Sequence, residues 1–111
     1  MNLSLVIPVY NEEASLPILF DAVQRALKPV KRKWEVVFVD DGSRDNSLNV
    51  LMKLAKQNPR QVRVIVFRRN FGQTAAITAG IDHASGEIIV LLDADMQNDP
   101  ADIPRLLAKL D

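Results

Sequence analysis

Two aspartates separated by one residue follow the most apolar stretch of the chain. Residues 88–92 are all apolar, and several are β-branched. They run directly into Asp93 and Asp95, and Gln97 follows two residues later. A short continuous apolar run is typical of a strand buried on both faces in a parallel sheet. Side chains two positions apart on an extended chain point the same way, so these oxygen donors can converge on Mg²⁺ or Mn²⁺.

A bare Asp-x-Asp pair is also common by chance. Asp93 could instead open a turn, with the Asp95 carboxylate in solvent. Whether the pair forms a metal site or a solvated turn therefore depends on the elements that position it.

Polar residues also follow the first predicted strand, residues 3–9. Pro8 should lie near the end of that strand, because proline cannot donate a hydrogen bond to a neighbouring strand. The loop after it begins with Tyr10, Asn11 and Glu12. The Tyr10 ring can stack on a base or close the edge of the core.

The second predicted strand, residues 34–39, runs into two adjacent acids, Asp40 and Asp41. Either Asp45 or Asn46 can cap the helix that follows. Capping explains one acid in this loop but not two at the end of a buried strand, so Asp40 or Asp41 is a candidate ligand-binding residue.

The third predicted strand, residues 62–67, ends in a basic segment. Arg63 interrupts its apolar run, as is common on an edge strand. A helix with small residues is predicted over 71–84, and Asn70 is its expected cap. A helix start beside Arg69 is suited to an anion such as a diphosphate, although arginines at a strand end can also be merely solvated.

Helical spacing of apolar residues follows each of the four strands, and Ser15 is the expected cap of the first helix. Strict alternation of strand and helix predicts an α/β, doubly wound, Rossmann-like parallel sheet with strand order 3-2-1-4. Strands one and four are then neighbours at the switch point, so the loops after them face one crevice.

Composition excludes several classes of function. The 111 residues contain 14 basic and 14 acidic side chains, so charge argues for neither a nucleic-acid partner nor an anionic membrane. There is no cysteine, which excludes disulfides and thiolate chemistry and fits the cytoplasm. The apolar residues 3–9 are too few for a membrane span.

Five motifs in order resemble family 2 inverting glycosyltransferases of the GT-A fold, and among them the polyprenyl-phosphate sugar transferases. They are Pro-Val-Tyr-Asn-Glu at 8–12, Val-Asp-Asp-Gly-Ser at 39–43, Arg-Asn-Phe-Gly at 69–72, Ala-Ser-Gly at 84–86 and Asp-Ala-Asp at 93–95. Each motif alone is weak, and the ordered set covers the whole chain.

The resemblance implies roles for individual residues. The implied nucleotide-sugar-binding residues are Pro8, Tyr10, Asn11, Glu12, Asp40, Asp41, Arg69 and Asn70. Asp93 and Asp95 are the implied catalytic residues, and with Gln97 they are the implied ligands of Mg²⁺ or Mn²⁺. Which of Asp40 and Asp41 contacts the base stays open.

The expected reaction is metal-dependent transfer of a sugar, with inversion, from a UDP- or GDP-linked donor to an acceptor. A polyprenyl phosphate, the lipid acceptor that the resemblance implies, is already anionic and needs little help from a general base. We expect residues 1–111 to be one nucleotide-sugar-binding domain from the amino-terminal half of a larger enzyme. Alone it is expected to be inactive and to self-associate through the edge of the fourth strand. The expected location is the cytoplasm or the cytoplasmic face of a membrane.

Two other classes of protein use a similar sheet. A nucleotide-binding module without turnover would bind without needing Asp95. An aspartate-based phosphoryl-transfer domain would usually carry its nucleophile after the first strand, where this chain has Tyr10 and Asn11. A Rossmann dehydrogenase is disfavoured, because Gly-x-Gly-x-x-Gly does not follow the first strand.

Overall fold

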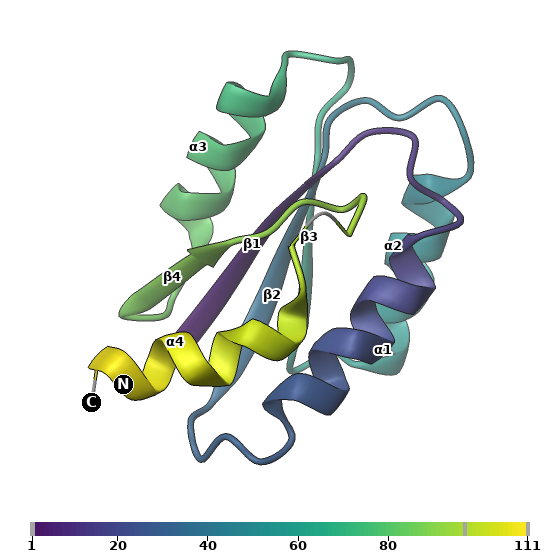
Figure 1. The fold of residues 1–111 in the computed structure, drawn as a ribbon. Coiled ribbons are helices and arrows are strands. Elements are labelled where there is room, and N and C mark those ends of the chain that lie inside the picture. Colours follow the sequence, from purple (N-terminus) through teal and green to yellow (C-terminus); the bar gives the residue numbers. More distant parts are fainter. Residues whose placement is uncertain (1, 97, 111) are drawn as a thin grey trace.

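The computed structural model describes residues 2–96 and 98–110 as a parallel sheet of four strands with helices on both faces (Figure 1). The strands are β1 (Leu3–Val9), β2 (Trp34–Asp40), β3 (Val62–Val66) and β4 (Ile88–Leu91). The helices are α1 (Leu16–Leu27), α2 (Ser47–Gln57), α3 (Gln73–His83), the short 3₁₀ helix η1 (Pro100–Asp102) and α4 (Ile103–Leu110). The order β3-β2-β1-β4 confirms the predicted doubly wound sheet. No described helix is long and apolar enough to cross a bilayer.

One face of the sheet carries the main core, under α1, α2 and α4. Alternate β1 residues, among them Leu5 and Ile7, meet Phe38 of β2 there and are fully buried. Helix α1 adds five buried side chains at the predicted spacing of three and four residues. These side chains are Leu16, Leu19, Phe20, Val23 and Leu27. Because α1 is fixed along this face, the loop that precedes it is held over the carboxyl end of β1.

The opposite face is covered by α3, whose small side chains allow close packing. Ala76 is fully buried against Val37 and Val39. A Cβ atom on Gly80 would collide with the Val6 side chain. The small residues of this helix therefore set its distance from β1 and β2.

The prediction that the fourth strand is buried on both faces is wrong. Ile88 and Val90 pack against the main core, but Ile89 is 38% exposed and Leu91 is 47% exposed. The reason is topological: β4 lies at the edge of the sheet, whereas α3 packs mainly over β1 and β2. Arg63 lies on the other edge strand, β3, which confirms the interpretation of that residue.

A buried acid near the amino end of β2 ties three parts of the fold together. Glu35 Oε2 accepts hydrogen bonds from Ser4 Oγ at 2.6 Å, Ser85 N at 2.7 Å and Ser85 Oγ at 2.9 Å. Glu35 Oε1 lies 3.2 Å from Arg63 Nη1. Burial acts to raise the pKa of Glu35, but these hydrogen bonds outweigh it and hold that pKa below its ordinary value.

The turn before β4 is held by the same network, defined here as the Glu35 network (Glu35, Ser4, Ser85 and Arg63). Gly86 N donates to Ser4 Oγ at 2.8 Å. A Cβ atom on Gly86 would lie 2.6 Å from Ser4 Oγ and 2.7 Å from Ser4 N. The turn thus sits directly on β1, which fixes where β4 starts and so where Asp93 emerges.

Candidate functional site

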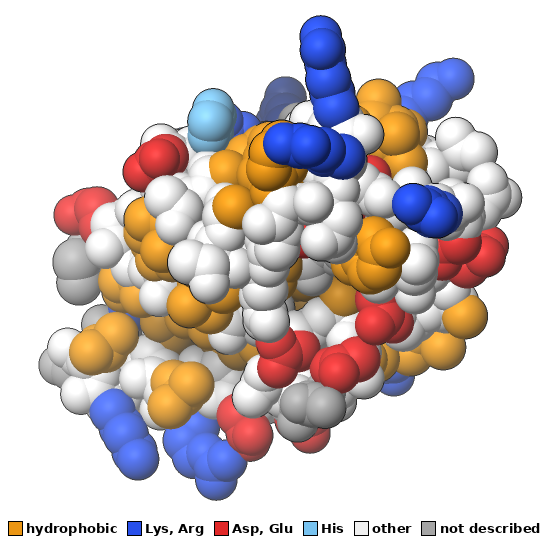
Figure 2. All heavy atoms as spheres, turned by 90° about the horizontal axis from the view of Figure 1, so that it is seen from above, with side chains coloured by type: hydrophobic (Ala, Val, Ile, Leu, Met, Phe, Trp, Pro, Cys, Tyr) orange, Lys and Arg blue, Asp and Glu red, His pale blue; other side chains and the backbone are white. Residues whose placement is uncertain are grey.

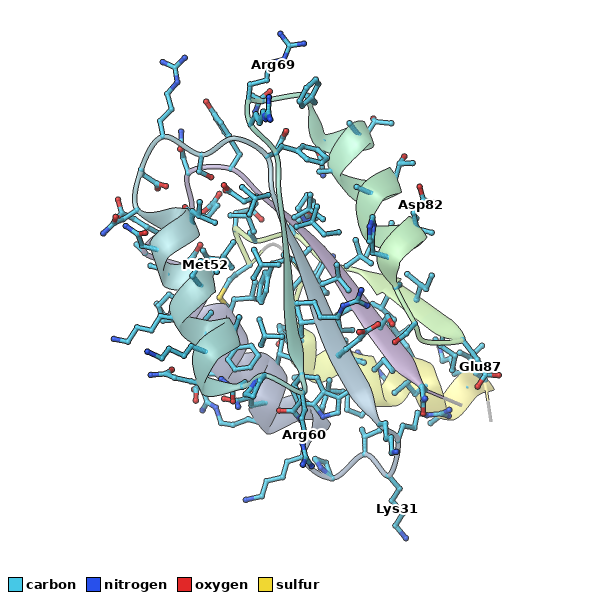
Figure 3. All side chains as sticks on the ribbon, turned by 180° about the vertical axis from the view of Figure 1, so that it is seen from behind. Lys31, Met52, Arg60, Arg69, Asp82 and Glu87 are labelled. Atoms are coloured by element: carbon cyan, nitrogen blue, oxygen red, sulfur yellow. The ribbon has the colours of Figure 1, made fainter. Side chains whose placement is uncertain are left out.

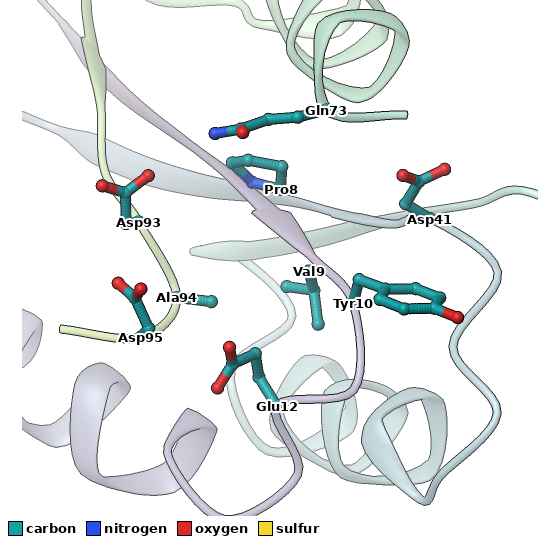
Figure 4. Close-up of a pocket in the computed structure, with 9 residues that line it drawn as sticks. All are labelled: Pro8, Val9, Tyr10, Glu12, Asp41, Gln73, Asp93, Ala94 and Asp95. Carbon is teal, nitrogen blue, oxygen red and sulfur yellow. The ribbon is translucent and has the colours of Figure 1, made fainter. Parts of the chain in front are cut away.

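A cavity of about 350 Å³ lies at the carboxyl ends of β1, β2 and β4 (Figure 4). Its lining residues are Pro8, Val9, Tyr10, Glu12, Asp41, Gln73, Asp93, Ala94 and Asp95. Strands β1 and β4 are hydrogen-bonded neighbours, so the loops that follow them meet here, as the strand order predicts. The space-filling view onto this end of the sheet shows a run of acidic side chains across its lower centre, while Lys and Arg side chains project at the top (Figure 2).

One end of the cavity is acidic. Asp93 and Asp95 point to the same side of their loop, while the Ala94 methyl group points to the other (Figure 4). Glu12 approaches from the loop after β1. Among the described residues, no three His, Cys, Asp or Glu side chains lie close enough to hold a metal ion. Gln97, the third predicted ligand, lies outside the described residues.

The other end of the cavity holds Tyr10 and Asp41. Tyr10 is 42% exposed, so its ring faces the cavity instead of closing the edge of the core. Asp41 Oδ1 accepts a hydrogen bond from Phe71 N at 2.8 Å, and Asp41 Oδ2 accepts one from Gly72 N at 3.1 Å. The Asp41 carboxylate is therefore held in one orientation by backbone N–H groups.

The adjacent acid, Asp40, has a different environment. It is the last residue of β2, is 2% exposed, and does not line the cavity. Its Oδ1 atom has no hydrogen-bond partner within the described part of the chain. Of the two candidate acids, the structure thus brings Asp41 and not Asp40 to the cavity.

Asn11 joins two loops and does not line the cavity. It has a φ of 52°, a conformation that asparagine adopts more readily than most residues. Its Oδ1 accepts from Arg44 N at 2.8 Å, and its own N donates to Ser43 Oγ at 3.0 Å. These contacts connect the loop after β1 with the loop after β2.

The first turn of α2 is capped by Asp45, although Asn46 occupies the cap position. Asp45 Oδ1 accepts from Ser47 N at 2.9 Å, and Asp45 Oδ2 accepts from Glu13 N at 3.3 Å. Burial acts to raise the pKa of Asp45, but the hydrogen bonds from Ser47 and Glu13 outweigh it, so this pKa is lowered. One carboxylate therefore caps α2 and holds the loop before α1.

The segment before α3 differs from the prediction. Helix α3 begins at Gln73 after Gly72, so Asn70 is not its cap, and the Asn70 amide instead donates to Asp41 O at 3.3 Å. Gly72 has a φ of 103°, which interrupts helical geometry before residue 73. Phe71 N and Gly72 N, which precede the helix, donate to the Asp41 carboxylate. A diphosphate at this helix start stays a prediction.

Arg69 lies outside the cavity. Its guanidinium group stacks on the Phe71 ring, 4.6 Å from the ring centre, and the side chain projects at the tip of the molecule (Figure 3). Of the eight implied nucleotide-sugar-binding residues, the structure brings Pro8, Tyr10, Glu12 and Asp41 together at the cavity.

Residues 4–111 match the family described as Glycosyl transferase family 2. The chain belongs to this family. It is 48% identical over 106 residues to the undecaprenyl-phosphate 4-deoxy-4-formamido-L-arabinose transferase of Pseudomonas fluorescens, covering 96% of this chain and 31% of that protein. The chain therefore spans about a third of the length of that curated relative.

Two solved structures share the fold of this family 2 chain. The mannosyltransferase PcManGT from Pyrobaculum calidifontis, in complex with GDP-Man and Mn²⁺, has a TM-score of 0.75 and 28% identity, covering 84% of this chain and 27% of that one. S. aureus TarS 1–349, in complex with UDP, has a TM-score of 0.81 and 26% identity, covering 100% of this chain and 32% of that one. The predicted membership in family 2 is confirmed.

Three features of this family 2 site did not follow from the sequence. Gln73, the first residue of α3, lines the cavity. The only sequence feature that could have indicated this is its position just after Gly72. The Asp41 contact with the start of α3 joins residues about 30 positions apart and left no local pattern. Ser15, expected as a cap, makes no side-chain capping bond and instead contacts Ala94.

Proposed function

We propose that this chain binds the donor of an inverting glycosyltransferase, which moves a sugar from a nucleoside diphosphate to a polyprenyl phosphate. The observation that carries the proposal is the two-ended cavity. An exposed aromatic ring and an oriented acid lie at one end, and two carboxylates on one side of a loop lie at the other. Membership in family 2 and the similarity to a named undecaprenyl-phosphate sugar transferase support it.

The nucleoside is assigned to the Tyr10 end. The half-exposed Tyr10 ring offers a stacking surface for a base. The Asp41 carboxylate, already oriented by Phe71 N and Gly72 N, can accept a further hydrogen bond from a base N–H. Asp40 and Asp41 are both buried, at 2% and 3% exposed. Asp41 is preferred for this role because it lines the cavity and Asp40 does not.

The diphosphate and a divalent cation are assigned to the acidic end. Carboxylate oxygens on Asp93 and Asp95 form a hard donor set that fits Mg²⁺ or Mn²⁺, and Gln97 is proposed as a further ligand. When bound, such a cation would offset the negative charge that grows on the leaving diphosphate. Asp93 and Asp95 would hold and orient the donor, so that one displacement at the anomeric carbon inverts its configuration.

The acceptor explains why no general base is assigned. The oxygen of a polyprenyl phosphate is anionic before it attacks, so little proton removal is needed. We propose that residues 1–111 form the donor-binding domain of a protein that acts at the cytoplasmic face of a membrane.

Calorimetric titration of UDP and GDP into the chain, with and without Mn²⁺, tests the proposal. We expect one nucleotide to bind in a metal-dependent manner, and Asp95→Ala to weaken that binding by at least about tenfold. Asp82→Ala is the matched control, because Asp82 lies on α3 away from the cavity (Figure 3). If the affinity for the nucleotide changes neither with Mn²⁺ nor with Asp95→Ala, the result would favour a nucleotide-binding module without turnover.

A further inference from the structure

The Ser15 hydroxyl lies between the two loops that form the acidic end of the cavity. Ser15 Oγ is 2.9 Å from Glu12 Oε2 and 3.2 Å from Glu12 O. It is also 2.9 Å from the carbonyl oxygen of Ala94, the central residue of Asp93-Ala94-Asp95. One side chain at the start of α1 thus reaches both the loop after β1 and the loop after β4.

A serine hydroxyl carries a single proton, so it can donate to only one of these acceptors at a time. Glu12 Oε2 and Ala94 O lie at the same distance and compete for it. A carboxylate is the stronger acceptor while it is charged and has no other partner. Once Glu12 is engaged by a cation or by a ligand N–H or O–H group, the Ser15 hydroxyl donates its hydrogen bond to the Ala94 carbonyl instead.

The Ala94 carbonyl is a sensitive point of the loop. Ala94 is 5% exposed and belongs to the main core, so its backbone has little freedom to shift independently. The bond from Met96 N to Asp93 O, which closes the turn, is long at 3.4 Å. The Ser15 hydrogen bond is therefore a short restraint on the backbone between the two aspartates.

We propose that Ser15 is a positioning residue for Asp93 and Asp95, and that its hydroxyl couples their loop to the Glu12 carboxylate. When the cavity is empty, the hydroxyl alternates between donating to Glu12 and donating to Ala94. When Glu12 is engaged, the Ser15 hydroxyl donates to the Ala94 carbonyl. This hydrogen bond holds the loop of Asp93 and Asp95 in its ligand-binding conformation. The inference rests on the proposed donor and metal site.

Amide hydrogen exchange tests the contact without any ligand. We expect Ser15→Ala to speed exchange of the 94–96 amides by about tenfold, and Ser15→Thr, which keeps the donor, to stay within about twofold of the wild type. Thr78→Ala is the matched hydroxyl deletion, because Thr78 bonds only Thr74 O of its own helix in the described structure. Unchanged exchange in Ser15→Ala would overturn the proposal.

Titration with Mn²⁺ in the presence of UDP or GDP tests the coupling. We expect Ser15→Ala to raise the Mn²⁺ concentration for half-saturation about tenfold, with metal-free nucleotide affinity within twofold and Ser15→Thr restoring the wild-type value. Equal weakening of metal-free and metal-dependent binding would overturn the positioning role. If the wild type shows no metal-dependent binding but Ser15→Ala still speeds exchange at 94–96, the proposed function fails and the contact stands.

Discussion

Two buried acids on the same strand have opposite surroundings. Glu35 and Asp40 lie near the two ends of β2 and are 8% and 2% exposed. The Glu35 carboxylate accepts four hydrogen bonds, whereas Asp40 Oδ1 has no partner among the described residues. An unpaired buried acceptor lowers the stability of the fold. Asp40 is therefore a position that stability alone does not explain.

The comparison separates a stabilising end of the sheet from a binding end. At the amino end, the Glu35 network closes on itself and fixes the turn before β4. At the carboxyl end, the Asp41 carboxylate is held by two backbone N–H groups and still lines a cavity. Substitutions at the amino end should therefore lower stability, and those at the carboxyl end should lower binding as well.

Two glycine substitutions give the largest expected effects. A Cβ atom on Gly42 would lie 2.5 Å from Asn70 N, and Gly42 has a φ of 70°. We expect Gly42→Ala to cost about 3 kcal/mol of unfolding free energy, and Gly86→Ala, which crowds Ser4, to cost about 2 kcal/mol, both measured by urea unfolding.

Nucleotide binding distinguishes the two glycine variants. Gly42 packs against the segment that orients Asp41, so Gly42→Ala should also weaken UDP or GDP binding to the folded protein. Gly86→Ala should affect binding much less, because Gly86 contacts the far end of β1. Equal loss of binding in both variants would remove the distinction between the two ends.

Amide substitutions of the two acids form a matched pair with unequal expected effects, neither larger than that of Gly86→Ala. Glu35→Gln places an NH₂ group among donors, so we expect a loss of about 2 kcal/mol. Asp40→Asn removes no hydrogen bond to Oδ1, so its cost should be below about 1 kcal/mol. Urea unfolding at pH 7 measures both. A cost for Asp40→Asn equal to that for Glu35→Gln would show that Asp40 has a strong partner after all.

The smallest effect is the pH dependence of the stabilisation by Glu35. The pKa of Glu35 is lowered in the folded state, so its stabilisation is present above the unfolded pKa of about 4.3 and is lost as the pH falls through the folded pKa. The difference in unfolding free energy between the wild type and Glu35→Gln should shrink from pH 7 to pH 3. Asp45 also has a lowered pKa but is present in both proteins and cancels. A difference that stays constant with pH would contradict the role given to Glu35.

Most of the fold could be predicted, because apolar periodicity is a local property of the sequence. The runs around Ile7, Phe38 and Ile88 marked strands, and the spacing in α1 marked its buried face. The exposure of Ile89 and Leu91 could not be predicted in this way, because it depends on which strands α3 covers. An apolar run alone does not distinguish an edge strand from an interior one.

For the candidate site, the sequence predicted which loops form it but not which of their side chains line the cavity. By itself, the sequence determined that polar residues follow the strands, since turn chemistry is local. Alternation along an extended chain was the wrong basis for expecting Asp93 and Asp95 to share a direction, because β4 ends at Leu91 and Asp93 opens a turn that Met96 N closes on Asp93 O. Only the tertiary structure decided that Asp41 and not Asp40 lines the cavity, that Asp41 accepts a hydrogen bond from Phe71 N, and that Ser15 reaches Ala94. Such contacts join residues about 30 to 79 positions apart, so they depend on how the helices pack on the sheet and not on any local pattern.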